Sequence, residues 1–128
     1  MADLPKLLIV DDEPSVCETL KIALSDLFNV VYFTNLDEAR LFINENQDLK
    51  FMILDYLVNR ESGIDFYKNE LYRKVNLPTI LISGFIGQVN TTKEETRELE
   101  KLFIKMLEKP FDIIELRTFL AERLTQKS

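Results

Sequence analysis

The chain contains no histidine and a single cysteine, Cys17. Without histidine it has no imidazole base, no histidine metal ligand and no phosphohistidine of its own. A lone cysteine cannot form a disulfide within the chain, and we interpret Cys17 as a small, half-buried helix residue. These absences leave carboxylates, hydroxyls and amines as the groups available for chemistry.

Long apolar runs are also absent. None approaches the ~20 residues of a membrane helix, and no signal-peptide pattern opens the chain, so we expect a cytoplasmic protein with no membrane partner. The net charge of −6 speaks against a nucleic-acid partner. With 128 residues, 46% of them hydrophobic and 30% charged, residues 1–128 are expected to form one globular domain.

Short apolar runs alternate along the chain with segments of helical period. The apolar runs predict strands at 6–10, 30–33, 50–54, 78–82 and 104–108. The periodic segments predict helices from Pro14, where Asp12 or Glu13 would act as the cap, at 36–45, 64–75 and 91–102, and after Asp112. Residues 56–62 are expected to form a polar loop. Five successive strand–helix units indicate an α/β fold with a doubly wound, five-stranded parallel sheet.

Polar side chains follow four of these strands at the point where each strand ends. Asp11 and Asp12 follow the first strand, Asp55 the third, Ser83 the fourth and Lys109 the last. In an open parallel sheet the carboxyl ends of the strands meet at the edge where ligands bind. Each residue alone has an ordinary explanation as a turn, a helix N-terminus or a solvated side chain, but their agreement on one edge favours a functional site.

The residue types at this edge suit phosphoryl chemistry. Three neighbouring carboxylates repel one another, and a hard divalent cation with oxygen ligands, Mg²⁺ above all, relieves that repulsion. One carboxylate could then act as a nucleophile toward a phosphoryl group. A lysine and a hydroxyl would neutralise and hydrogen-bond the phosphoryl oxygens.

The chain resembles the receiver domains of two-component response regulators over essentially its whole length. The segments that carry the resemblance are LIVDDEP at 8–14, Asp55 with the downstream Gly63, LISG at 81–84, and KPF at 109–111. The resemblance implies a flavodoxin-like sheet with strand order 2-1-3-4-5 and five helices.

The resemblance also implies roles for the acidic residues. Asp55 would take a phosphoryl group from the phosphohistidine of a histidine kinase or histidine phosphotransfer protein. Asp12 would bind Mg²⁺ directly and Asp11 through water, while Asp55 and the backbone carbonyl of Leu57 would supply further ligands. The domain would assist both its own phosphorylation and its own dephosphorylation, which would be slow, without being an enzyme in the usual sense.

Two further roles and an output follow from the same resemblance. Ser83 and Lys109 would hold the phosphoryl oxygens, and the Lys109–Pro110 peptide bond would be cis. Because the last predicted helix takes up the C-terminal residues, we expect the output to be a phosphorylation-dependent contact with a downstream protein, or phosphoryl relay to another histidine-bearing protein.

The chain departs from the receiver pattern at several positions. Asn59 stands where receivers usually have proline, a change expected not to touch the chemistry directly. Met106 replaces the usual Tyr or Phe, and the segment between Ser83 and Lys109 is a few residues longer. We therefore expect the signal to pass through the loop at 84–87 and a lengthened fourth helix.

Three alternatives remain open at this point. An aspartyl-nucleophile phosphohydrolase would place its carboxylates as Asp-x-Asp after the first strand, whereas this chain has the adjacent pair Asp11-Asp12. A flavin-binding, flavodoxin-like protein would need a Ser/Thr/Gly-rich phosphate loop at that place. A degenerate receiver would no longer accept phosphate, although every expected site position is filled here.

Overall fold

The computed structural model describes residues 3–84 and 92–125. Five parallel strands form one sheet in the order β2-β1-β3-β6-β7, which is the predicted order 2-1-3-4-5 when these strands alone are counted. Their bounds are Lys6–Val10 (β1), Asn29–Phe33 (β2), Leu49–Asp55 (β3), Thr79–Ser83 (β6) and Lys105–Glu108 (β7). The predicted doubly wound sheet is therefore confirmed, with strand boundaries within a residue or two of those expected.

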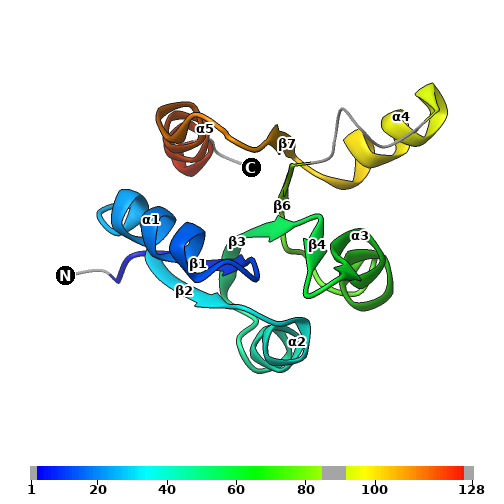
Figure 1. Cartoon of the computed structure of the whole chain (residues 1–128). Helices are drawn as coiled ribbons and strands as arrows, with labels where there is room; N and C mark the ends of the chain where they lie inside the picture. Colours follow the sequence, from blue (N-terminus) through cyan, green and yellow to red (C-terminus); the bar gives the residue numbers. More distant parts are fainter. Residues whose placement is uncertain (1–2, 85–91, 126–128) are drawn as a thin grey trace.

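Helices cover both faces of the sheet (Figure 1). On one side lie α1 and α5, and on the other lie α2 and α3, with α4 beside the β6–β7 end of the sheet. The helix bounds are Pro14–Leu24 (α1), Leu36–Glu45 (α2), Gly63–Phe66 (α3), Lys93–Leu102 (α4) and Ile113–Thr125 (α5). Crossovers of this kind bury both faces of a parallel sheet, which explains its almost uninterrupted apolar strands.

The helices begin where the sequence supplies caps. The Asn35 side chain accepts a hydrogen bond from the Glu38 amide at the start of α2, and Thr92 and Glu95 form a reciprocal capping box on α4. The Asp112 carboxylate accepts from the Ile114 amide at 2.8 Å, as predicted for the last helix. At α1 Glu13 occupies the N-cap position, one of the two predicted, but its side chain makes no capping hydrogen bond. The Glu13 amide donates to Oδ1 of Asp11 at 2.9 Å.

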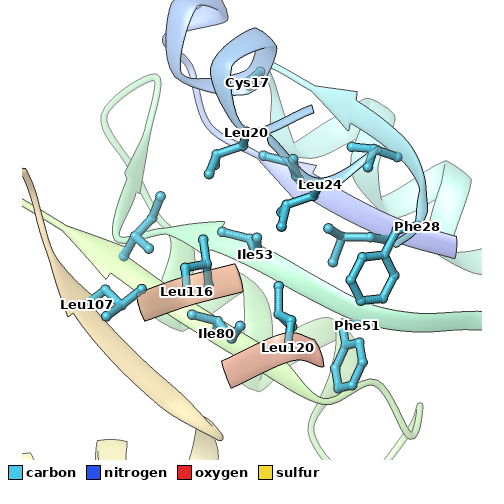
Figure 2. Close-up of a cluster of buried hydrophobic side chains, with 14 residues drawn as sticks. Cys17, Leu20, Leu24, Phe28, Phe51, Ile53, Ile80, Leu107, Leu116 and Leu120 are labelled. Atoms are coloured by element: carbon cyan, nitrogen blue, oxygen red, sulfur yellow. The ribbon is translucent and has the colours of Figure 1, made fainter. Parts of the chain in front are cut away.

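Alternating side chains of each strand divide between two cores. Leu7 and Ile9 of β1 face α1 and α5, whereas Leu8 and Val10 face α2 and α3. Figure 2 shows the first core, in which side chains from α1 and α5 close over the strands. Its labelled members are Cys17, Leu20, Leu24, Phe28, Phe51, Ile53, Ile80, Leu107, Leu116 and Leu120. Cys17 is fully buried here, so its description as half-buried was wrong.

The segment after β3 differs from the expected polar loop. Residues Leu57–Val58 (β4) pair with Glu61–Ser62 (β5) as a short antiparallel hairpin. The two linking residues, Asn59 and Arg60, have φ values of 52° and 69°. A two-residue hairpin loop with both φ angles positive matches the right-handed twist of its strands, and asparagine is one of the residues that tolerate such a φ.

The third helix ends earlier than its apolar pattern predicts. After α3 a π-helical turn covers Tyr67–Leu71 (η1), and the chain then leaves the helix at Tyr72. Arg73 has a φ of 63°, in the left-handed region. The amide of Val75 still donates to the Leu71 carbonyl at 2.9 Å, and its side chain packs on the α2–α3 core, so the helical spacing persists without a helix.

The region expected to carry the signal is described only in part. The loop at 84–87 lies outside the described residues except for Gly84, which is exposed. Helix α4 is charged along its length and has no buried residue among those described. Met106 lies partly buried on β7, in register with Leu81 of β6. Among residues 3–84 and 92–125, no helix is both long and apolar enough to cross a lipid bilayer.

Leu116→Ala should lower the free energy of unfolding by about 2–5 kcal/mol, because the side chain is completely buried between α5 and the sheet. The matched control is Ile114→Ala on the same helix, where the side chain is 74% exposed and a change within about 0.5 kcal/mol is expected. Urea denaturation measures both. Equal losses in the two variants would contradict this placement of α5.

Candidate functional site

The sheet brings the predicted polar residues to one edge. Asp11 follows β1 directly, Asp55 ends β3, Ser83 ends β6 and Lys109 follows β7. The strands are direct neighbours: Val10 pairs with Leu54, Asp55 with Ile82, and the Lys109 amide donates to the Ser83 carbonyl at 2.8 Å. Parallel pairing in register thus places all four residues at the same carboxyl edge.

Three carboxylates gather at this edge. Oxygen atoms of Asp11, Asp12 and Asp55 all lie within 4.8 Å of one another. Asp11 is fully buried, Asp55 is 6% exposed and Asp12 is partly buried. Carboxylates this close, with this little access to water, repel one another strongly when all three are ionised.

Lys109 offsets part of this repulsion. Its ammonium lies 2.9 Å from Oδ2 of Asp11 and 3.2 Å from Oδ2 of Asp55, and so bridges the two buried carboxylates. A third carboxylate, that of Glu13, lies 3.7 Å from the same nitrogen. The predicted cis peptide bond between Lys109 and Pro110 is confirmed. One cation therefore faces several acidic side chains, and the site as a whole stays negative.

The pKa values of Asp55 and Lys109 are both raised, but for different reasons. Burial, followed by the charge of Asp11, raises the pKa of Asp55 from 3.8 to about 6, despite the opposing effect of Lys109. Burial alone would lower the pKa of Lys109, but hydrogen bonding to Asp11 and the charges of both carboxylates outweigh it and raise that pKa. Lys109 thus remains a cation, while the ionised form of Asp55 is less favourable than that of an exposed aspartate.

Asp11 is fixed by contacts beyond the ion pair. Its Oδ1 accepts the Glu13 amide at 2.9 Å, and its backbone carbonyl lies 3.3 Å from the Cys17 thiol as a hydrogen-bond acceptor. Burial, together with the charge of Asp11, raises the pKa of Cys17 to about 12. The thiol is therefore a neutral packing group beneath the site and not a reactive one.

Gly63 allows the chain to pass close to Asp55. A Cβ at this position would lie 2.1 Å from the Asp55 carbonyl oxygen, and the Gly63 amide donates to the Tyr56 carbonyl at 2.7 Å. A side chain here would push the β4–β5 hairpin away from the carboxylate cluster. The pairing of Asp55 with Gly63 in the sequence thus reflects a close backbone approach and not a need for positive φ.

The structure also places the remaining predicted residues. Ser83 is fully buried at the end of β6, and Leu57 is 36% exposed at the start of β4, where it pairs with Ser62. Their expected roles toward a phosphoryl group and a metal stay predictions.

Two residues near the carboxylates were not identified from the sequence as site residues. Glu13 approaches Lys109, as described above, and the backbone amide of Asn59 donates to Oδ2 of Asp12 at 3.0 Å. Asn59, which was expected not to touch the chemistry directly, thus contacts one of the predicted metal ligands. The replacement of proline was itself the available signal, because proline has no amide hydrogen to donate.

The cluster suits a hard divalent cation. It offers only oxygen donors, from three carboxylates on two neighbouring strand ends, and leaves their charge incompletely neutralised by Lys109. Mg²⁺ prefers such ligands and usually binds through a few carboxylates together with water and phosphate oxygens. The residues present therefore fit the predicted metal.

Gly63→Ala should destabilise the protein by about 1–3 kcal/mol, because the added methyl group would overlap the Asp55 carbonyl. Gly84→Ala is the matched control, since a Cβ there meets no atom of residues 3–84 and 92–125 within 4 Å, and it should change stability by less than about 0.5 kcal/mol. Chemical denaturation compares the two. A Gly63→Ala protein as stable as the control would show that the close approach is absent.

Asp55→Asn should stabilise the metal-free protein at neutral pH. Because the native pKa is raised above 3.8, the unfolded state loses this proton first, and wild-type stability falls as pH rises from about 4 to about 6. The variant should match the wild type near pH 4 and exceed it by on the order of 1–3 kcal/mol above pH 6.

Denaturation in a chelating buffer across this pH range measures the difference. Asp65→Asn, which changes an exposed carboxylate of α3, is the control and should show no such gain. A constant difference between the Asp55 variant and the wild type from pH 4 to pH 8 would contradict the raised pKa.

Comparisons with known proteins identify the family to which this fold belongs. The family description "Response regulator receiver domain" matches residues 7–121. The cell cycle transcriptional regulator CtrA of Caulobacter vibrioides is 30% identical over 80 residues, which are 62% of this chain and 34% of that protein. The chain thus spans about a third of the length of the curated relatives it matches.

Solved structures show the same fold. A response regulator receiver domain (CheY-like) from Methylobacillus flagellatus has 26% identity and a TM-score of 0.76, covering 94% of this chain and 98% of that one. The non-phosphorylated HemR receiver domain from Leptospira biflexa, at 23% identity, has a TM-score of 0.78 and covers 97% of each chain. With the family match over residues 7–121, these findings establish that the chain belongs to the response regulator receiver domain family.

Proposed function

We propose that this receiver domain is a phosphoacceptor of a two-component system or phosphorelay, with Asp55 as the residue that takes the phosphoryl group. The observation that carries the proposal is the arrangement around Asp55. Its carboxylate ends a central strand, lies 3.2 Å from the Lys109 ammonium and shares a 4.8 Å cluster with Asp11 and Asp12. This arrangement provides a nucleophile, a cation for phosphoryl oxygens and a set of metal ligands in one place.

The proposed reaction is a transfer from nitrogen to oxygen. A carboxylate oxygen of Asp55 attacks phosphorus, an O–P bond forms as the P–N bond of a phosphohistidine breaks, and the imidazole nitrogen leaves with the electron pair. Lys109 neutralises one phosphoryl oxygen and the Ser83 hydroxyl donates to another. Asp11, Asp12, Asp55 and the Leu57 carbonyl would hold Mg²⁺, which when bound supplies positive charge to the phosphoryl oxygens.

The alternatives considered from the sequence are less well supported. Receiver domains are phosphoacceptors and not enzymes that act on an external substrate, and the adjacent Asp11-Asp12 pair lacks the spacing of an aspartyl phosphohydrolase. A degenerate receiver would have lost part of the site, whereas here the three carboxylates and Lys109 lie together. The geometry therefore favours a domain that still accepts phosphate.

The partners follow from the same chemistry. Because residues 1–128 contain no histidine, the phosphohistidine would lie outside them, on a histidine kinase or a histidine phosphotransfer protein. The phosphorylated domain would then change its contact with a downstream protein in the cytoplasm. The net charge of −6 supports a protein and not a nucleic acid as the target of this domain.

Incubation with acetyl phosphate and Mg²⁺ should add one phosphate to the wild-type chain, measured by intact mass. Asp55→Asn should abolish the added mass because the nucleophile is gone. The control Asp65→Asn removes an exposed carboxylate from α3 and should be labelled like the wild type. Labelling of the Asp55 variant at the wild-type level would rule out Asp55 as the acceptor.

A further inference from the structure

The tip of the β4–β5 hairpin has an unusual backbone. Asn59 and Arg60 are consecutive non-glycine residues in the left-handed region, with φ values of 52° and 69°. Such conformations cost an L-residue free energy, although asparagine tolerates them better than most. Strained residues of this kind persist where surrounding contacts hold them, and they concentrate at functional sites.

The contacts of Asn59 explain why the strain is maintained. Its backbone amide donates to Oδ2 of Asp12 at 3.0 Å, and its side-chain Nδ2 donates to the Thr34 carbonyl at 2.9 Å. Thr34 directly precedes Asn35, which caps α2. A single hairpin residue thus connects the loops that follow β1 and β2, and one end of this connection is a carboxylate of the acidic cluster.

Few residue types at position 59 could make both of these hydrogen bonds. Proline has a φ fixed near −65° and no amide hydrogen, so it can neither adopt the observed conformation nor donate to Asp12. Glycine could adopt the conformation and donate, but it lacks the amide side chain that binds the Thr34 carbonyl. Asparagine at position 59 satisfies the backbone conformation and both hydrogen bonds together.

The hydrogen bond acts on the most accessible carboxylate of the cluster. Asp11 is held by Lys109 and by the Glu13 amide, and Asp55 by Lys109. Asp12 is instead bound by the hairpin amide. A donor on one carboxylate oxygen restricts the side-chain rotamer and leaves the second oxygen available, which is how hydrogen bonds around a metal site orient its ligands.

We propose that Asn59 is a positioning residue for Asp12 and thereby sets the affinity of the Asp11–Asp12–Asp55 cluster for a divalent cation. The inference rests on the proposed function of this cluster as a Mg²⁺ site and adds a determinant that lies outside the carboxylates. Asn59 acts through its backbone amide, and its side chain anchors the hairpin tip to the loop before α2.

The test is a calorimetric titration of Mg²⁺ into wild-type protein, Asn59→Pro, Asn59→Gly and Arg60→Gly. Asn59→Pro should weaken Mg²⁺ binding by about tenfold or more, the range typical for lost hydrogen bonds to metal ligands. Asn59→Gly keeps the amide donor and should lose less affinity than the proline variant. Arg60→Gly relieves the neighbouring strained position without removing either hydrogen bond, and should bind as the wild type does.

Nuclear magnetic resonance provides a second measurement that does not require the proline variant to fold. In metal-free protein, Asp12→Asn replaces a charged acceptor by a neutral one and should shift the Asn59 amide resonance upfield. The Arg60→Gly control should leave the Asp12–Asn59 hydrogen bond in place.

The outcomes separate the two levels of the proposal. If the wild type binds Mg²⁺ and folded Asn59→Pro binds equally well, the positioning role is wrong while the proposed metal site stands. An Asn59 amide that is insensitive to Asp12→Asn would also overturn the positioning role, whether or not the proline variant folds. If the wild type itself does not bind Mg²⁺, the metal site of the proposed function fails.

Discussion

Repulsion among three carboxylates at one sheet edge is the interaction on which the site depends. The fold forces Asp11 and Asp55 onto adjacent strand ends and removes them from water, and a single ammonium, that of Lys109, is shared between them. Burial, followed by the charge of Asp11, raises the pKa of Asp55. An arrangement that is costly when metal-free is one that gains when a cation and a phosphoryl group arrive, because their binding relieves the repulsion.

The rest of the structure serves to maintain this arrangement. Two apolar cores, one on each face of the sheet, fix the strands so that their carboxyl ends cannot separate. Gly63 lets the hairpin approach the Asp55 carbonyl, and buried, neutral Cys17 fills the space beneath Asp11. Such packing holds like charges closer together than they would lie in water. The resulting loss of stability is offset by apolar packing elsewhere in the fold.

The sequence predicted the parallel sheet and the grouping of Asp11, Asp12, Asp55 and Lys109, because these depend on apolar runs and on the residue that ends each run. The strand order was implied by the resemblance to receiver domains. The sequence-based prediction failed where the same spacing of apolar residues is compatible with both a helix and a turn. Leu71 and Val75 have helical spacing, yet Val75 reaches the core from a turn after the helix has ended. The burial of Cys17 depends on the packing of distant segments, which local spacing does not record.

Asn59 shows how a departure from a family pattern carries structural information. At the level of sequence, the absence of proline in a surface loop is a minor change with no obvious chemical meaning. In three dimensions it frees an amide hydrogen, permits a left-handed turn and brings the hairpin tip against Asp12. The backbone strain at Asn59 and Arg60 is thus linked to the crowded carboxylates. The strained turn places the Asn59 amide where it donates a hydrogen bond to the negatively charged Asp12.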